Sequence, residues 1–248
     1  MSHFKDRTEI DAFAKTSLFY SVDPRVKLLC TIALIVVIAL LTSLEAVILA
    51  GTFVLFLIAI SKVPITHLAR QFAMALIFIL FAALSMLFYR GWENALIIGL
   101  RISVCVLALL LMVTTTPFFK MIKAMRWMHI PKLMASLLMF TYRFIFLLLD
   151  EMDRMRLARQ ARGFTGGRSL LDKRALRTVS NTIGMTFVRA NARATNIYDA
   201  LLMRGYSGEI RDFENLRMRP RDVAFAACFT LVVALTITIE LGVMTWKL

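Results

Sequence analysis

The run ALIIGLRISVCVLALLLMV, at residues 95–113, contains one charged side chain, Arg101, in a continuous apolar stretch. A bilayer core is crossed by roughly 20 apolar residues in helical form, with a range of about 17–25. The run therefore predicts a membrane-spanning helix. Four further apolar runs lie on either side of it, at residues 26–43, 46–60, 72–88 and 223–244. The sequence predicts an all-α integral membrane protein with about five transmembrane helices.

The distribution of charge predicts how these spans are oriented. The chain has 248 residues, is 59% hydrophobic and carries a formal net charge of +14. Residues 114–222 hold 20 Lys+Arg and 9 Asp+Glu, a net +11. Because basic loops stay in the cytoplasm, we expect the amino terminus and this segment to be inside and the carboxyl terminus outside. Three regions follow: a four-helix membrane domain (1–114), a cytoplasmic domain (115–221) and a last span (222–248).

Within the cytoplasmic region, residues 118–127 alternate cations with apolar side chains and predict an amphipathic helix that ends before Pro131. Residues 132–162 contain neither glycine nor proline and predict one long helix. Its first half, 133–149, is apolar enough to be a sixth span. That alternative would place Arg143 near mid-membrane at a cost of at least about 2.5 kcal/mol, so we expect the helix to lie beneath the membrane. A further long helix is predicted from about Ser169 to Arg204.

Two segments end in the same pattern. Ala161-Arg162-Gly163 is followed by Phe164, and Met203-Arg204-Gly205 is followed by Tyr206. Glycine readily adopts the left-handed conformation that stops a helix, so each arginine is expected on the last turn of its helix. Guanidinium groups held in this way suit bidentate binding of carboxylates. The alternative reading is an ordinary helix stop, but the duplication favours two docking ends for a partner.

The sequence lacks the patterns of catalytic, nucleotide or metal sites. It has no HExxH pair and no GxxxxGK[ST] loop. Asp150, Glu151 and Asp153 lie among arginines on a charged helix, and we interpret them as surface ion pairs. Arg101 and Glu240 are the ionisable side chains that we place within the spans, which indicates a scaffold rather than a solute pathway. We therefore expect a non-catalytic chain with neither a metal site nor a cofactor of its own.

Together these motifs resemble the transmembrane T component of energy-coupling factor (ECF) transporters, and within it the cobalt/nickel CbiQ family. The resemblance rests on Asp23-Pro24-Arg25-Val26-Lys27-Leu28, on Thr114-Thr115-Thr116-Pro117, on residues 140–151 (FTYRFIFLLLDE) and on the two Arg-Gly segments. The family pattern has Ala-Arg-Gly at both ends. Met203 replaces the second alanine and leaves the arginine and glycine unchanged.

The resemblance implies a multi-subunit importer in the plasma or inner membrane of a prokaryote. It also implies that the long coupling helices of residues 115–221 cross each other. Two ABC ATPases would bind ATP and Mg²⁺ and dock on residues 161–163 and 203–205. A CbiM-like S component, with or without a small CbiN-like subunit, would capture cobalt or nickel. Lipid would surround the spans, and no nucleic acid is expected as a partner. The residues expected to contact the S component are Phe118, Phe119, Ile122, Met125, Leu133, Leu137, Phe140 and Tyr142.

Two other functions stay open at this point. The same coupling role could serve another S component, such as one for biotin or other vitamins. Alternatively, the basic region could belong to a membrane-anchored adaptor for anionic lipid or nucleic acid, which predicts binding with a steep salt dependence. A diffuse electrostatic surface would not require arginines at glycine stops, so the coupling role is favoured. An integral membrane enzyme is disfavoured because catalytic groups do not cluster.

Overall fold

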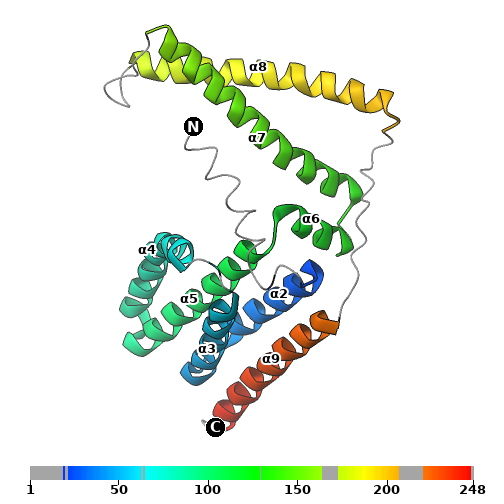
Figure 1. Cartoon of the computed structure of the whole chain (residues 1–248). Coiled ribbons are helices and arrows are strands. Elements are labelled where there is room, and N and C mark those ends of the chain that lie inside the picture. Colours follow the sequence, from blue (N-terminus) through cyan, green and yellow to red (C-terminus); the bar gives the residue numbers. More distant parts are fainter. Residues whose placement is uncertain are drawn as a thin grey trace. The chain divides into compact units, whose positions relative to one another are not determined.

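The computed structural model describes residues 19, 22–61, 63, 65–128, 130–163, 173–206 and 220–246. The regular structure in these residues is entirely helical, which confirms the predicted all-α class (Figure 1). The helices are α2 (Pro24–Leu40), α3 (Leu44–Ser61), α4 (Ile65–Arg90), α5 (Trp92–Thr115), α6 (Phe118–Trp127), α7 (Lys132–Ala161), α8 (Lys173–Met203) and α9 (Pro220–Trp246).

The chain divides into two compact units. The first, here called the membrane unit, comprises Met1–Met128 and Glu214–Leu248, and therefore holds α2 to α6 and α9. The second, the helix-pair unit, comprises His129–Phe213 and holds α7 and α8. The boundary falls after α6, so this helix groups with the apolar helices. We had placed residues 118–127 in the cytoplasmic region with the two long helices.

Among the residues that the structure describes, five helices are long and apolar enough to cross a membrane. Four of them, α3, α4, α5 and α9, contain the runs predicted at 46–60, 72–88, 95–113 and 223–244. The fifth is Leu133–Ala161 in α7, the segment for which a sixth span was the alternative. Helix α2 is not among the five; its 17 residues are at the lower limit for crossing a bilayer core.

The core of the membrane unit forms where small side chains let helices approach closely. Ala46, Ala50 and Ala108 are buried with Leu34 and Ile38. Small residues at helix interfaces allow the van der Waals packing on which helix association in lipid depends. Helix α9 packs against α2 and α3, and its Phe229 meets Phe53 edge to face with ring centroids 5.1 Å apart.

Arg101 and Glu240, the two charges predicted within the spans, bind opposite sides of one turn. Arg101 donates hydrogen bonds to the carbonyls of Ala39 and Leu41, at the end of α2. Glu240 accepts from the backbone N–H groups of Thr42 (2.8 Å) and Ser43 (3.1 Å), just before α3. A cation at a helix carboxyl end and an anion at a helix amino end both complement the helix dipole. These two charges therefore stabilise the α2–α3 turn.

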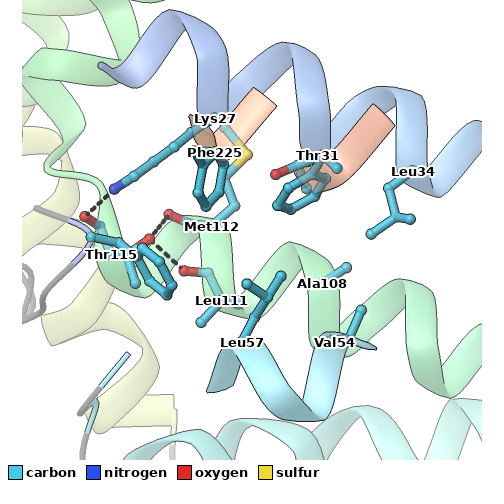
Figure 2. Close-up of a pocket in the computed structure, with 12 residues that line it drawn as sticks. Lys27, Thr31, Leu34, Val54, Leu57, Ala108, Leu111, Met112, Thr115 and Phe225 are labelled. Carbon is cyan, nitrogen blue, oxygen red and sulfur yellow. Dashed lines mark hydrogen bonds between the residues drawn. The ribbon is translucent and has the colours of Figure 1, made fainter. Parts of the chain in front are cut away.

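A second polar cluster lies where α2 begins, and it includes contacts between residues that are far apart in the sequence. Asp23 caps α2 as the Asp-Pro pair predicts, its side chain accepting from the Arg25 N–H at 3.0 Å. The Asp23 N–H donates to Asp222 Oδ1 on α9 at 2.8 Å. Lys27 is only 4% exposed, and its ammonium donates to the Thr115 carbonyl at 3.3 Å (Figure 2). The sequence did not predict that Lys27 is buried.

Lys27 and Thr115 close one end of an otherwise apolar cavity in the membrane unit. Figure 2 shows Leu34, Val54, Leu57 and Ala108 along its wall. Its volume is about 20 Å³, which is room for about one water molecule. This cavity is too small to hold a hydrated metal ion.

Candidate functional site

The first Arg-Gly segment forms a tightly capped helix end. Helix α7 ends at Ala161, and Arg162 follows as the C-cap with φ −85° and ψ 12°. The backbone N–H of Arg162 donates to the carbonyl of Arg159 (3.1 Å), and the N–H of Gly163 donates to the carbonyl of Gln160 (3.0 Å). Gly163 has a φ of +79°, the left-handed region that favours glycine. The arginine is therefore held on the last turn, as predicted.

The second segment has the same geometry and is described one residue further. The backbone N–H groups of Arg204 and Tyr206 both donate to the carbonyl of Leu201, each at 3.0 Å. The N–H of Gly205 donates to the carbonyl of Leu202 at 2.9 Å. Gly205 has a φ of +76°. The bonds from Gly205 and Tyr206 are the pair that defines a Schellman motif. Phe164, the counterpart of Tyr206, lies outside the described residues. The two segments therefore share the geometry of the helix end as well as the Arg-Gly sequence.

We expect Gly205→Ala to loosen this stop. A Cβ at Gly205 would meet nothing within 4 Å, so the substitution acts only through its positive φ. The left-handed conformation costs an alanine about 1–2 kcal/mol. The amide of Tyr206 should therefore exchange with deuterium about 5- to 30-fold faster. Gly205→Asn is the matched control, because asparagine tolerates this conformation. Equal exchange in the alanine and asparagine variants would contradict the account.

The side chains at both ends face outward. Arg162 and Arg204 are exposed, as are their neighbours Ala161 and Met203. Met203, which replaces the expected small residue, is 92% exposed. A methionine in that position offers an adaptable apolar contact beside the arginine. Each end is therefore a cation on a rigid helix stop, available to a partner.

The two ends are well separated within the helix-pair unit. Arg162 and Thr182 line the same pocket, so the end of α7 lies beside the first half of α8 (Figure 1). Arg204 lies 22 residues beyond Thr182 along α8. At 1.5 Å per residue this is about 33 Å. A single binding groove cannot take both arginines, so the arrangement suits two separate grooves.

Contacts between α7 and α8 connect the two ends. Arg159 donates to Thr182 Oγ1, and Arg189 pairs with Glu151. The hydrogen bond from Arg189 holds the pKa of Glu151 below its usual range. Glu151 therefore takes part in an ion pair, as we interpreted it, although its partner is on the other long helix. Near the end of α8, Tyr206 packs edge to face on Phe140 with centroids 6.2 Å apart.

The predicted S-component contacts of α7 present an apolar surface. Leu133 is 63% and Leu137 is 51% exposed. Phe140 and Tyr142 are half-buried, and Tyr142 stacks edge to face on Phe146. Exposed leucines on a helix need lipid or a protein partner to cover them. Contact between these α7 residues and an S component stays a prediction.

The predicted contacts of α6 differ from one another in exposure. Phe119 is 40% exposed, and Phe118 and Met125 are half-buried. Ile122, in contrast, is only 2% exposed. Helix α6 packs against α2, and Ile122 lies on its covered side. We therefore remove Ile122 from the surface expected to meet a partner.

Helix α6 is fastened to α2 by residues that the sequence does not bring together. The Arg25 guanidinium lies 5.6 Å from the centre of the Trp127 ring, a distance at which a cation–π attraction operates. Thr115, whose carbonyl receives Lys27, immediately precedes the turn into α6. Arg25 and Lys27 of α2 therefore help to attach α6 to the rest of the membrane unit.

Among the described residues, no group of His, Cys, Asp and Glu has a metal-binding arrangement.

Comparison with known proteins gives a consistent picture. A family model described as CbiQ, a cobalt transport protein, matches residues 15–214. An uncharacterized protein of Methanocaldococcus jannaschii is 23% identical over 92% of this chain and 85% of its own length. The energy-coupling factor transporter transmembrane protein EcfT of Bacillus subtilis is 26% identical over 78% of this chain and 82% of its own. The cobalt transport protein CbiQ of Rhodobacter capsulatus is 30% identical over 53% of this chain and 48% of its own.

Proposed function

This chain belongs to the CbiQ family, as the multi-pass membrane T component of an ECF transporter, and we propose that it couples two ATPases to a substrate-binding membrane partner. The chain itself is a non-catalytic component. ATP and Mg²⁺ bind to the ATPases, which hydrolyse the nucleotide. The helix-pair unit is cytoplasmic, and the complex sits in the plasma or inner membrane of a prokaryote.

The duplicated helix stop is the observation that carries the proposal. Arg162 and Arg204 have similar caps and both are exposed, and about 33 Å of helix separates Arg204 from Thr182, which lines the same pocket as Arg162. Two similar tips at that separation suit two similar grooves, one on each ATPase. A guanidinium in such a groove binds a carboxylate through two parallel hydrogen bonds. An anionic lipid surface would require neither the repeated cap nor its glycine.

Movement of the ATPases would pass through the helix pair. When ATP closes the ATPases, their grooves approach and carry the two arginine tips with them. Helices α7 and α8 are joined by the Arg159–Thr182 and Glu151–Arg189 contacts, so they respond as packed elements that shift between discrete arrangements. The exposed leucines Leu133 and Leu137, with Phe119 of α6, then transmit the shift to the CbiM-like S component.

We propose cobalt, or the chemically similar nickel, as the transported ion. The family description and the Rhodobacter capsulatus relative support cobalt. A different S component, for a vitamin such as biotin, is the second candidate. It is favoured by relatives that carry the general name EcfT, such as those of Bacillus subtilis and Clostridium kluyveri.

Affinity purification of the tagged chain from its native membrane tests this proposal. We expect two ATPase subunits and one further integral membrane protein to elute with it. Vesicles containing the complex should accumulate radioactive cobalt only when ATP is present on the ATPase side. Uptake of biotin but not cobalt would favour the second candidate. Recovery of the chain without any ATPase would contradict the coupling role.

A further inference from the structure

A basic pocket lies between α7 and α8 beside the first docking end. Its volume is about 330 Å³, enough for more than one side chain. Three arginines are among the residues that line it: Arg159, Arg162 and Arg189. The other lining residues are neutral: Met155, Ala158, Thr178, Asn181, Thr182 and Met185. Among the residues that the structure describes, the pocket therefore gathers positive charge without a carboxylate in its lining.

The three arginines are not equivalent. Arg189 already pairs with Glu151, which lines a neighbouring pocket instead. Arg159 donates to the hydroxyl of Thr182, a neutral acceptor that leaves its charge uncompensated. Arg162 is exposed on the helix stop. The pocket thus holds Arg159 in a fixed position next to the arginine that is proposed to dock.

We propose that this pocket accepts an aspartate or glutamate side chain that projects from the ATPase beside the groove for Arg162. The inference rests on the proposed docking of Arg162 and adds a second contact to it. The two contacts would interlock: the tip of α7 enters the ATPase, and an acidic side chain of the ATPase enters the pocket. Arg159, already oriented by Thr182, would bind the carboxylate with a charge-assisted hydrogen bond.

The second docking end has a different surface. Next to Arg204 lie the exposed Met203 and Leu202, and Tyr206 packs on Phe140. The two ends would therefore bind by different means. Docking at the α7 end depends more on charge and weakens more when salt is raised, because salt screens exposed charges. Docking at the α8 end depends more on apolar contact.

The test isolates each end in the full-length chain, purified in nanodiscs and titrated with its own ATPase subunits. With Arg204→Ala present, only the α7 end docks. Adding Arg159→Gln should then weaken ATPase binding about 10- to 100-fold, the effect of losing one hydrogen bond to a charged group. With Arg162→Ala present instead, only the α8 end docks, and Arg159→Gln should change binding less than about threefold.

Two control variants separate the pocket from other effects. Arg156→Gln removes an exposed arginine of α7 that does not line the pocket, and it should leave binding unchanged. Thr182→Val removes the acceptor of Arg159 but keeps the charge, so it should weaken binding far less than Arg159→Gln. Equal losses for Thr182→Val and Arg159→Gln would overturn the inference, because the loss would then come from contact between the helices.

The same titrations distinguish failure of the pocket from failure of docking. If Arg162→Ala weakens binding but Arg159→Gln behaves like Arg156→Gln, the pocket is overturned and the docking role of Arg162 stands. If Arg162→Ala leaves both affinity and salt dependence unchanged, the proposed docking is overturned and the pocket inference falls with it.

Discussion

Replacing Arg162 and Arg204 together with alanine will release the ATPases from this chain and abolish ATP-dependent uptake. Each arginine is exposed on a glycine-capped helix end, and its proposed partner is a carboxylate in an ATPase groove. Truncating one member of a buried charge pair costs about 2–5 kcal/mol. A single substitution should therefore weaken docking at its own end by about 30-fold to several thousand-fold.

The two losses should add because the ends are far apart. Sites more than about 7–10 Å apart that share no partners usually behave independently, and Arg204 is about 33 Å along the helix from Thr182, which lines the pocket beside Arg162. Each single variant should keep a weakened complex through its remaining end. Only the double variant should lose both ATPases. The amount of ATPase that co-elutes with the tagged chain measures this directly.

Arg156→Ala is the matched control for both substitutions. It removes an exposed arginine from the same charged part of α7 and leaves both helix stops intact. It should retain the ATPases and the uptake activity of the unmodified chain. Arg162→Lys adds a finer test, since it keeps the charge but loses the planar fork. A double alanine variant that still held stoichiometric ATPase would contradict docking through the arginines.

The helices and their stops could be predicted from local sequence. Apolar runs of bilayer length predicted α3, α4, α5 and α9. The glycines at 163 and 205 predicted helix ends, and both have a positive φ. Asp23-Pro24 predicted the start of α2. In each case the determining residues lie within a few positions of one another, so the local physics of capping and hydropathy is sufficient.

Interactions between distant residues could not be read in the same way. The cluster around Lys27 joins residues 23, 27, 115 and 222, and its members look like unrelated surface charges in the sequence. Helix α6 resembles an independent amphipathic helix, yet Arg25 lies over Trp127 and Ile122 is buried. The basic pocket beside Arg162 likewise exists only because α8 packs against α7. Charge and periodicity indicate an amphipathic surface, but they do not say which helix covers it.

Removing the carboxylate of Asp222 will destabilise the membrane unit. Asp222 is 2% exposed and accepts the backbone N–H of Asp23. Its negative charge acts on the buried ammonium of Lys27, which Lys120 repels. Asp222→Leu removes this charge and leaves the buried Asp23 N–H without its acceptor, and an unsatisfied buried donor costs about 1–3 kcal/mol. For a unit of this size the midpoint of thermal unfolding should fall by about 2–12 °C.

Two further variants show which part of Asp222 is responsible. Asp222→Asn removes the charge but keeps an oxygen for the Asp23 N–H, so it reports the charge alone. Lys27→Met combined with Asp222→Leu removes both charges, so no buried ammonium is left without the nearby negative charge of Asp222. The combined variant should therefore unfold at a higher temperature than Asp222→Leu. If it unfolds at a lower one, the two charges do not compensate each other, and the cluster stabilises α2 and α9 through its hydrogen bonds alone.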